Sequence, residues 1–314
     1  MKKLIVSILA ALFILGTLSA EEEKQEEPKS KVKYSTNINL VISYPWEGRL
    51  GVTETFKVPV LNFDNPFMRG NNIAFKLGAE LTPVTLEGKF DVVWTPLAFL
   101  EVYGGASIGS GWKLSNWHGL SLNEKKNGKT HKVPINFQKA FYSANFGGAL
   151  QFDLGAIIPT DWTHIIMRTD QYFLYRGVAG LNSLESWVIL DDDGENRNGF
   201  TYCASYVLGY QMPLPMNMIA FRLETKKTFF SVPDGVDKST WGEDRFNMLF
   251  GPIISFKPID KLTILLIAQW KNVRSYTDDD DTTFYQTRTI DKNKGDKVIF
   301  RRVGIIFDIN IPNN

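Results

Sequence analysis

The sequence predicts an all-β fold, an antiparallel transmembrane β-barrel of about 12 strands, within a range of about 10–14. Three observations lead to this prediction. The chain starts with an export signal, many segments alternate apolar and polar residues with a period of two, and the links between them alternate between short and long. Such alternation separates an apolar face from a polar one, as a barrel wall in lipid requires.

Residues 1–20 have the composition of a secretory signal peptide. Two lysines precede an apolar run from Leu4 to Leu15, and small polar residues follow as far as Ala20. The run is shorter than the roughly 20 residues that a spanning helix needs, so we expect cleavage near Ala20 or Ser19 instead of a membrane anchor. No cysteine lies near this boundary, so we expect no lipid modification there.

Residues 21–33 are acidic and polar and contain almost nothing to bury, which predicts a flexible segment before a barrel at 34–314. The formal charge is +1, and removal of the two signal-peptide lysines leaves −1, a balance that indicates no nucleic-acid partner. The single cysteine, Cys203, excludes an intramolecular disulfide framework. Because Cys203 alternates with Thr201 and Ser205, we expect it to be a small, unreactive lumen residue.

Twelve segments carry the alternation. In residues 72–82, for example, Phe75 and Leu77 lie on one face and Lys76 and Glu80 on the other. In chain order the predicted strands cover 35–45, 48–60, 72–82, 84–95, 97–110, 141–154, 162–176, 200–211, 216–230, 243–256, 261–276 and 297–311. A soluble β-sandwich or lipocalin-like barrel is the alternative, with the apolar face turned into a closed core.

The links between these strands alternate in length. Those after the fourth, sixth, eighth and tenth strands are short and contain proline, whereas those at 112–138, 177–198, 231–242 and 277–296 are long and polar. Short periplasmic turns and longer external loops are typical of outer-membrane barrels. Tryptophans at both strand ends predict two aromatic girdles: Trp94 and Trp162 at the short turns, and Trp46, Trp112 and Trp241 at the long loops. The first three strands fit this pattern less well, so their pairing stays open.

Near the C-terminus, "RVGIIFDI" resembles the β-signal by which outer-membrane barrels are recognised for assembly. The matching positions are Arg302, Gly304, Phe307 and Ile309, although "NIPNN" follows where the common bacterial form ends on an aromatic residue. The resemblance implies the outer membrane of a diderm bacterium as the location, and the barrel assembly machinery and outer-membrane lipid as partners. More loosely, residues 81–112 resemble uncharacterised spirochaetal outer-membrane barrel proteins, which implies a location and no activity.

No motif in the sequence indicates catalysis, so we expect no enzyme, no cofactor and no metal centre. The three histidines, His118, His131 and His164, lack a local serine or cysteine motif, and this also weighs against a barrel phospholipase. The acidic stretches at 191–199 and 278–281 offer oxygen ligands that suit calcium, but the first lacks the glutamate of an EF-hand. Solvated acidic loops are the simpler interpretation, and calcium binding stays open.

Charged residues of both signs fall on the predicted inward face, which is the main functional signal. The predicted lumen residues are Lys76, Glu80, Glu87, Lys89, Asp91, Glu101, Asp153, Arg168, Asp170, Arg222, Glu224, Arg245 and Arg302. Twelve strands lie between a filled barrel of about eight and an open channel of about sixteen. We therefore predict a passive, narrow channel for small hydrophilic solutes. The alternative is a non-conducting structural or adhesive barrel that presents loop 112–138 to a partner. The sequence predicts neither the solute nor the oligomeric state.

Overall fold

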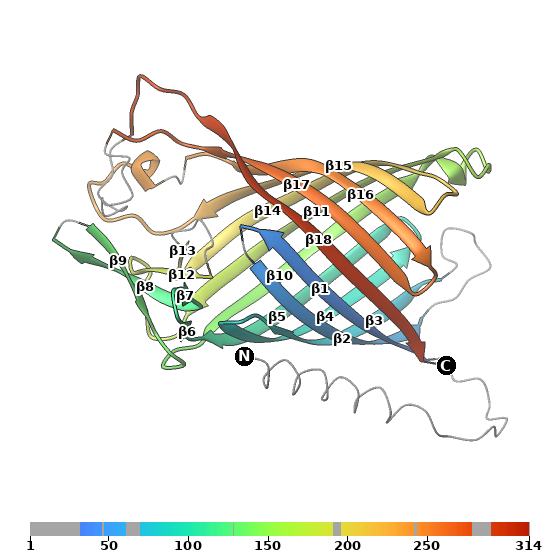
Figure 1. Cartoon of the computed structure of the whole chain (residues 1–314), viewed down its shortest axis with the longest axis horizontal. Helices are drawn as coiled ribbons and strands as arrows, with labels where there is room; N and C mark the ends of the chain where they lie inside the picture. The colour runs from blue at the N-terminus through green and yellow to red at the C-terminus, as the bar shows by residue number, and fades with distance from the viewer. Residues whose placement is uncertain are drawn as a thin grey trace. The chain divides into compact units, whose positions relative to one another are not determined.

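The computed structural model describes residues 32–45, 47–60, 70–127, 129–190, 196–241, 244–277 and 290–313. Within them, twelve antiparallel strands close into a barrel in the order β1-β18-β17-β16-β15-β14-β11-β10-β5-β4-β3-β2 (Figure 1). The predicted all-β fold and its strand number are confirmed. The signal peptide at 1–20 and most of the acidic segment at 21–33 lie outside the described residues. Among the described residues, no helix is long and apolar enough to cross a membrane.

Each barrel strand pairs with its neighbours in the chain, and the last strand pairs with the first. The strands are β1 (Lys33–Tyr44), β2 (Glu47–Pro59), β3 (Asn72–Leu81), β4 (Thr85–Leu97), β5 (Leu100–Gly111), β10 (Phe141–Asp153), β11 (His164–Val178), β14 (Gly199–Gln211), β15 (Met216–Phe229), β16 (Asn247–Ile259), β17 (Leu262–Val273) and β18 (Lys297–Asn313). The pairing of the first three strands, open from the sequence, is a sequential meander in which β2 joins β1 to β3.

The links follow the predicted alternation from β4 onwards. Tight connections join β4 to β5, β14 to β15 and β16 to β17, and the longer links lie at the opposite end of the barrel. The connection between β3 and β4 is a tight turn at the long-loop end, where the Thr82 hydroxyl accepts hydrogen bonds from the backbone N–H groups of Val84 and Thr85. The prediction for 243–256 is displaced, because β16 begins only at Asn247.

The outer face of the wall is apolar. Leu77, Phe146 and Leu208 are 60%, 66% and 57% exposed, although all three lie within barrel strands. Large apolar groups so exposed are stable in lipid and unfavourable in water. The alternative of a soluble sandwich or lipocalin-like barrel is therefore wrong, since the apolar face points outward instead of into a core.

Aromatic side chains mark both ends of the wall. At the short-turn end Trp94 and Trp162 are 41% and 53% exposed, and Tyr34 packs edge-on against Phe56 with 5.3 Å between ring centroids. At the long-loop end Trp270 packs edge-on against Phe300 at 5.8 Å. Trp112 departs from the prediction, because it stacks on the ring of Phe137 at 4.8 Å instead of standing alone at the wall. Trp46 and the side chain of Trp241 lie outside the described residues.

Two of the long links fold into strands of their own. The link after β5 contains β6 (Lys113–Leu114), β7 (Trp117–His118), β8 (Leu120–Lys126) and β9 (Lys129–Pro134), and the link after β11 contains β12 (Ser186–Ile189) and β13 (Asn196–Arg197). These form a four-stranded sheet, β13-β12-β8-β9, and a two-stranded ladder, β6-β7. We call strands β6–β9, β12 and β13 together the cap.

Candidate functional site: a charged lumen beneath a loop cap

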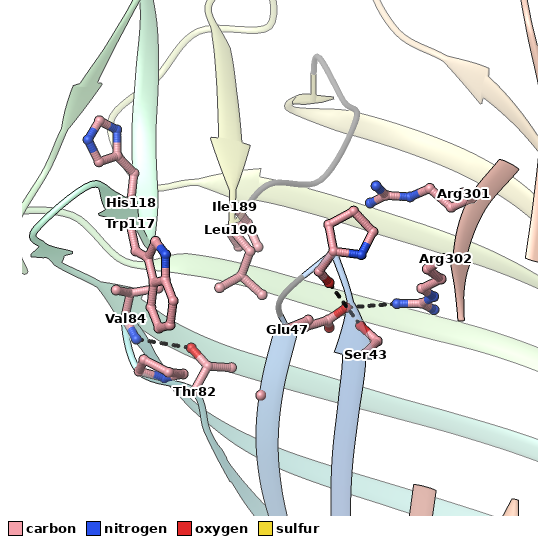
Figure 2. Close-up of a pocket in the computed structure, with 13 residues that line it drawn as sticks. Ser43, Glu47, Thr82, Val84, Trp117, His118, Ile189, Leu190, Arg301 and Arg302 are labelled. Carbon is pink, nitrogen blue, oxygen red and sulfur yellow. Dashed lines mark hydrogen bonds and ion pairs between the residues drawn. The ribbon is translucent and has the colours of Figure 1, made fainter. Parts of the chain in front are cut away.

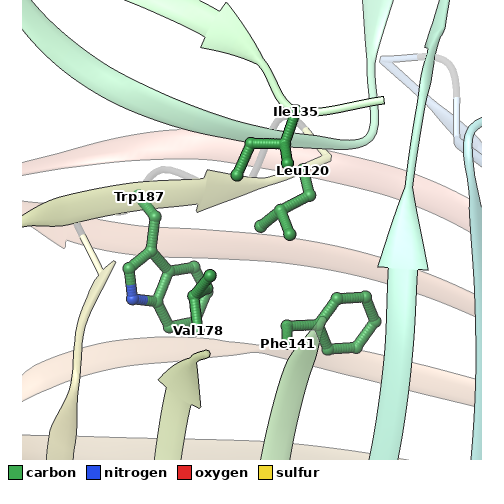
Figure 3. Close-up of a cluster of buried hydrophobic side chains, with 5 residues drawn as sticks. All are labelled: Leu120, Ile135, Phe141, Val178 and Trp187. Carbon is green, nitrogen blue, oxygen red and sulfur yellow. The ribbon is translucent and has the colours of Figure 1, made fainter. Parts of the chain in front are cut away.

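The cap has a hydrophobic core that includes the ends of two barrel strands. Figure 3 shows Leu120 of β8 and Trp187 of β12 gathered with Ile135, and with Phe141 of β10 and Val178 of β11. Leu120, Val178 and Trp187 are fully buried. Because burial of a large apolar side chain stabilises by roughly 1.5–3 kcal/mol, these contacts fix the cap to the barrel.

One asparagine completes the attachment of the cap. The Asn198 side-chain amide donates to the carbonyl oxygens of Val178 and Leu181 at 3.1 and 3.0 Å. Its oxygen accepts from the Val178 N–H at 2.8 Å and from the Trp187 indole N–H at 3.1 Å. Three of these bonds join the two ends of the link between β11 and β14. The fourth holds the indole of Trp187 in the middle of this link, so the position of Trp187 is set by polar as well as apolar contacts.

The cap crosses the end of the barrel. The cap is connected to the barrel through β5, β10 and β11. At its far side, Trp117 and Leu190 line a pocket together with Glu47 and Arg302 from the opposite part of the wall (Figure 2). The long-loop end of the lumen is therefore partly covered by a folded sheet. Nothing in the period-two pattern predicted this arrangement, because it depends on contacts between two separate loops.

Below the cap the lumen holds a cavity of about 700 Å³. Residues of β3, β4, β5, β10, β11, β14 and β15 line it, and these seven strands are consecutive in the barrel, so the cavity lies against one continuous half of the inner wall. Seven predicted lumen residues lie on its wall: Lys76, Asp91, Glu101, Arg168, Asp170, Arg222 and Glu224. Tyr103, Tyr172, Cys203 and Lys226 lie there as well, and Cys203 is almost fully buried.

Arg168 is the centre of the largest polar group in this cavity. Its guanidinium lies 2.7 Å from a Glu101 oxygen and 3.5 Å from an Asp170 oxygen, and it donates to the Gln151 side chain at 3.2 Å. The Tyr103 hydroxyl donates to Asp170. The side chains of Arg168 and Glu101 remain about a third exposed, at 31% and 35%, so water reaches the pair.

A second group joins three strands on the β2–β4 side. Lys89 lies 2.7 Å from a Glu80 oxygen and 3.4 Å from a Glu87 oxygen, and Arg49 lies 3.5 Å from Glu80. Cross-strand pairing explains the group, because Glu80 stands opposite Glu87 in the register and two cations offset their repulsion. We did not predict Arg49, although it alternates with Glu47 along β2 and this period could have identified it.

The remaining predicted residues are spread along the barrel. Arg222 contacts Glu224 at 3.0 Å and donates to Ser205, whereas Asp153 contacts His164 at 2.8 Å beside the short-turn end. Arg302 lies in the pocket under the far side of the cap. Asp308 was missed, yet it faces the same interior and accepts from Asn37 at 2.8 Å.

Arg245 differs from the prediction. It precedes β16, and its guanidinium contacts Asp296 at 2.5 Å instead of reaching the cavity. Burial lowers the pKa of Arg245 from its usual value, while the neighbouring Asp296 acts in the opposite direction. Arg245 was placed in the lumen because the alternation was extended backwards from the strand, whereas the backbone at 244–246 is not yet part of a strand.

A glycine makes room for one lumen carboxylate. A Cβ atom at Gly105 would lie 1.9 Å from an Asp91 oxygen and 3.0 Å from the Phe90 carbonyl oxygen. The position therefore excludes any side chain as long as Asp91 points into the cavity. Gly105 thus allows the close approach of a charged group from the neighbouring strand.

The metal and assembly predictions fall partly outside the described structure. Residues 191–195 and 278–281, which carry the acidic stretches, are not described, and among the residues that are, no group of three or more His, Cys, Asp and Glu side chains is arranged to hold a metal ion. Of the assembly-signal positions, Gly304, Phe307 and Ile309 pair with β1 residues at the barrel closure. Their role in assembly stays a prediction.

Comparison with known proteins yields distant structural neighbours and no relatives in sequence. No protein-family model matches the chain, and no curated protein matches its sequence. The β domain of the Bordetella autotransporter BrkA covers 89% of this chain over 98% of its own length, with 10% identity and a TM-score of 0.44. OmpT, an outer membrane protein of Vibrio cholerae, gives 9% identity, coverages of 89% and 99%, and a TM-score of 0.35.

OprD from Pseudomonas aeruginosa gives 10% identity, coverages of 90% of this chain and 94% of its own, and a TM-score of 0.30. All three scores are below 0.5, so these similarities carry no argument about function. They give no support to the resemblance to spirochaetal barrels. The twelve-stranded closed barrel with an apolar exterior and a charged interior is established by the strand pairing and burial of this chain itself.

Proposed function

We propose that this protein is an outer-membrane β-barrel that forms a narrow, hydrated channel for small hydrophilic solutes, partly covered by its cap. The observation that carries the proposal is the cavity of about 700 Å³, which is lined by charged side chains of both signs. An apolar exterior, a closed ladder of backbone hydrogen bonds and the export signal predicted from the sequence support placement in an outer membrane.

The ion pairs support a wet lumen. The side chains of Lys89, Arg168 and Arg222 are 36%, 31% and 43% exposed, although all point to the inside of the barrel. A dry interior would impose a desolvation penalty of several kcal/mol on each ion, whereas water in the lumen removes most of it. Hydrated charges along the wall are the environment in which a polar solute or ion can move.

The charge balance of the cavity supports weak ion selectivity. Its lining includes four cationic side chains, Lys76, Arg168, Arg222 and Lys226, and four carboxylates, Asp91, Glu101, Asp170 and Glu224. The two sets cancel, so the net field along the cavity is small even though local fields are strong. A strongly selective pore needs a ring of charges of one sign.

Planar bilayer recording tests the proposal. Purified protein should give discrete current steps in high salt at both polarities, and a double variant, Arg168→Ser with Arg222→Ser, should shift the reversal potential toward cation selectivity. Lys257→Ser is the matched control, because Lys257 pairs with Asp260 at the short-turn end and does not line the cavity. Absence of current steps in the wild-type protein, together with failure of liposome swelling, would reject the channel.

The cap favours a second candidate, a non-conducting barrel that presents its loops to a partner. The specific observation is the fully buried core under β8 and β12, which makes the cap a folded unit instead of a set of loose loops. A variant in which residues 113–138 are replaced by a short glycine-serine turn separates the two candidates. Conductance that appears only after this replacement favours the non-conducting barrel, whereas conductance in both proteins favours the channel.

A further inference from the structure

The outer wall of the barrel carries polar side chains on β11 and β14. Asp170 and Tyr172 of β11 line the lumen cavity. Because successive side chains of a strand point to opposite faces, Thr169 and Gln171 face the outside, and Gln171 is exposed there. On β14, Tyr206 stands opposite Thr169 in the register and is 43% exposed. We call the following residues the outer polar patch: Thr169, Gln171, Tyr202 and Tyr206.

The outer polar patch lies near the middle of the lipid-facing band. On β11, Ile165 follows closely after Trp162 at the short-turn end, and Tyr175 packs against Phe200 at the long-loop end, with 4.9 Å between ring centroids. A strand rises about 3.3 Å per residue and tilts by roughly 35–45°, so the ten residue steps from Ile165 to Tyr175 cover about 25 Å of membrane, the height of the apolar band. The two β11 residues of the patch lie on either side of the midpoint of this stretch.

The hydrogen-bonding capacity of Gln171 is only partly used. The Tyr202 hydroxyl donates to its Oε1 atom at 2.5 Å, and its Nε2 atom donates to the Thr169 hydroxyl at 3.4 Å. Within the part of the chain that the structure describes, the Gln171 side chain makes no other hydrogen bond. A side-chain amide has two N–H donors and an oxygen with two lone pairs. One N–H and one lone pair of Gln171 therefore remain for a partner outside the wall.

Other parts of the outer wall show why this amide is unusual. Phe90 of β4 and Phe146 of β10 are typical of the lipid-facing side, at 47% and 66% exposed. The Thr36 hydroxyl donates to Glu54 at 2.8 Å on β1 and β2, but this contact adjoins the aromatic pair at the short-turn end. Polar groups at that level reach the interface with water, whereas hydrocarbon offers no partner to an amide near the middle of the band.

The wall beside Gln171 allows a second surface to come close. Gly148 stands opposite Gln171 in the register of β10 and β11 and has no side chain. Along β10, Phe146 and Leu150 lie on either side of Gly148 and are 66% and 51% exposed. Small residues let two membrane-embedded backbones approach, and the apolar side chains around them supply packing contacts.

We propose that the outer polar patch is the contact surface between two copies of this chain in the membrane. An amide is self-complementary, because it donates and accepts at the same time. A two-fold axis along the membrane normal would bring Gln171 of one copy against Gln171 of the second copy, and the two amides would exchange two N–H···O bonds. In hydrocarbon such bonds and close packing drive association, since lipid is as apolar as the wall. The proposal rests on the membrane placement in the proposed function and not on conduction.

Sedimentation equilibrium of the purified protein in density-matched detergent micelles tests the association. We expect the wild-type protein to have the mass of two chains. Gln171→Leu keeps the size of the side chain and makes the outer wall more apolar, so the barrel should fold and the dimer should be about tenfold weaker, because two amide hydrogen bonds are lost. Gln151→Leu is the matched control: it removes an amide that accepts from Arg168 in the lumen, and it should leave the dimer unchanged.

Disulfide cross-linking in lipid vesicles locates the contact. The natural cysteine is first replaced by Cys203→Ser. In this background Gln171→Cys should form a disulfide-linked dimer under mild oxidation, because a two-fold axis places each residue 171 next to its equivalent. Leu77→Cys is the control, since Leu77 is 60% exposed on the outer wall of β3, outside the patch. It should remain monomeric on a non-reducing gel.

Three results would overturn the proposal. They are a monomeric wild-type protein, a dimer that Gln171→Leu does not weaken, and cross-linking of Leu77→Cys that is as efficient as that of Gln171→Cys. The channel is tested separately. Current steps from a monomeric protein reject the dimer and leave the channel in place, whereas a dimer that depends on Gln171 and gives no current steps does the reverse.

Discussion

The barrel wall and the cap are both built from antiparallel strands, yet they place their apolar side chains in opposite directions. In the wall, Phe146 is 66% exposed on the outside while its neighbour Asn145 lines the lumen cavity. In the cap, Leu120 and Trp187 are fully buried in a core between two loops. The difference shows that a period of two separates faces without stating which face is the interior. The surrounding medium decides that, lipid for the wall and water for the cap.

Cap and wall also differ in how polar groups are held. Asn198 makes four hydrogen bonds that hold the cap in place. Its side-chain nitrogen donates two of them and its side-chain oxygen accepts the other two, all within the protein. The lumen pairs, in contrast, are partly hydrated, as the exposed fractions of Arg168 and Glu101 show. Substitutions should therefore lower the free energy of unfolding strongly in the core of the cap and on the outer wall, and only slightly in the lumen.

The largest effect is expected from Trp187→Ala in the cap. Removal of a buried tryptophan typically lowers the free energy of unfolding by about 3–5 kcal/mol, and here the Asn198 oxygen also loses a donor. We expect the cap to open while the barrel remains closed, because the strand ladder does not involve β12. Limited proteolysis should cleave residues 112–140 in the variant and leave the barrel strands intact. Loss of the barrel as well would show that the cap and the wall are one cooperative unit.

A matched pair of substitutions tests the two faces of the wall. Phe146→Arg should lower the free energy of unfolding by about 2–4 kcal/mol, because it places a charge near the middle of the lipid-facing side. Asn145→Arg, one residue away, should be tolerated better, because its side chain enters the cavity that Asp91 and Asp170 also line. Chemical unfolding in lipid vesicles measures both values. Equal losses would contradict the assignment of outer and inner faces.

The smallest effect is expected from Lys89→Gln in the lumen. Lys89 contacts Glu80 and Glu87, but its side chain is 36% exposed, and exposed ion pairs typically contribute about 0.2–1 kcal/mol. The free energy of unfolding should therefore change by at most about 1 kcal/mol in the same vesicle assay. A loss as large as that of Phe146→Arg would mean that the lumen is dry and that its ion pairs are structural.

The sequence by itself determined most of the wall. Period-two alternation located all twelve barrel strands, because each strand separates its faces locally, and seven of the predicted lumen residues lie on one cavity for the same reason. Where the alternation was extended beyond a strand it was wrong, as for Arg245, whose backbone precedes β16 and whose partner Asp296 is distant in the chain.

Only the tertiary structure decided the cap, the pocket beneath it and the partners of each lumen charge. The cap depends on contacts between residues 112–140 and 179–198, and the pocket requires a register shift beside Arg301 that brings two neighbouring side chains to one side. Neither feature has a local signal, because a bulge and a loop–loop core are set by which distant segments meet. Alternation is a property of single strands, whereas pairing and capping are properties of the closed barrel.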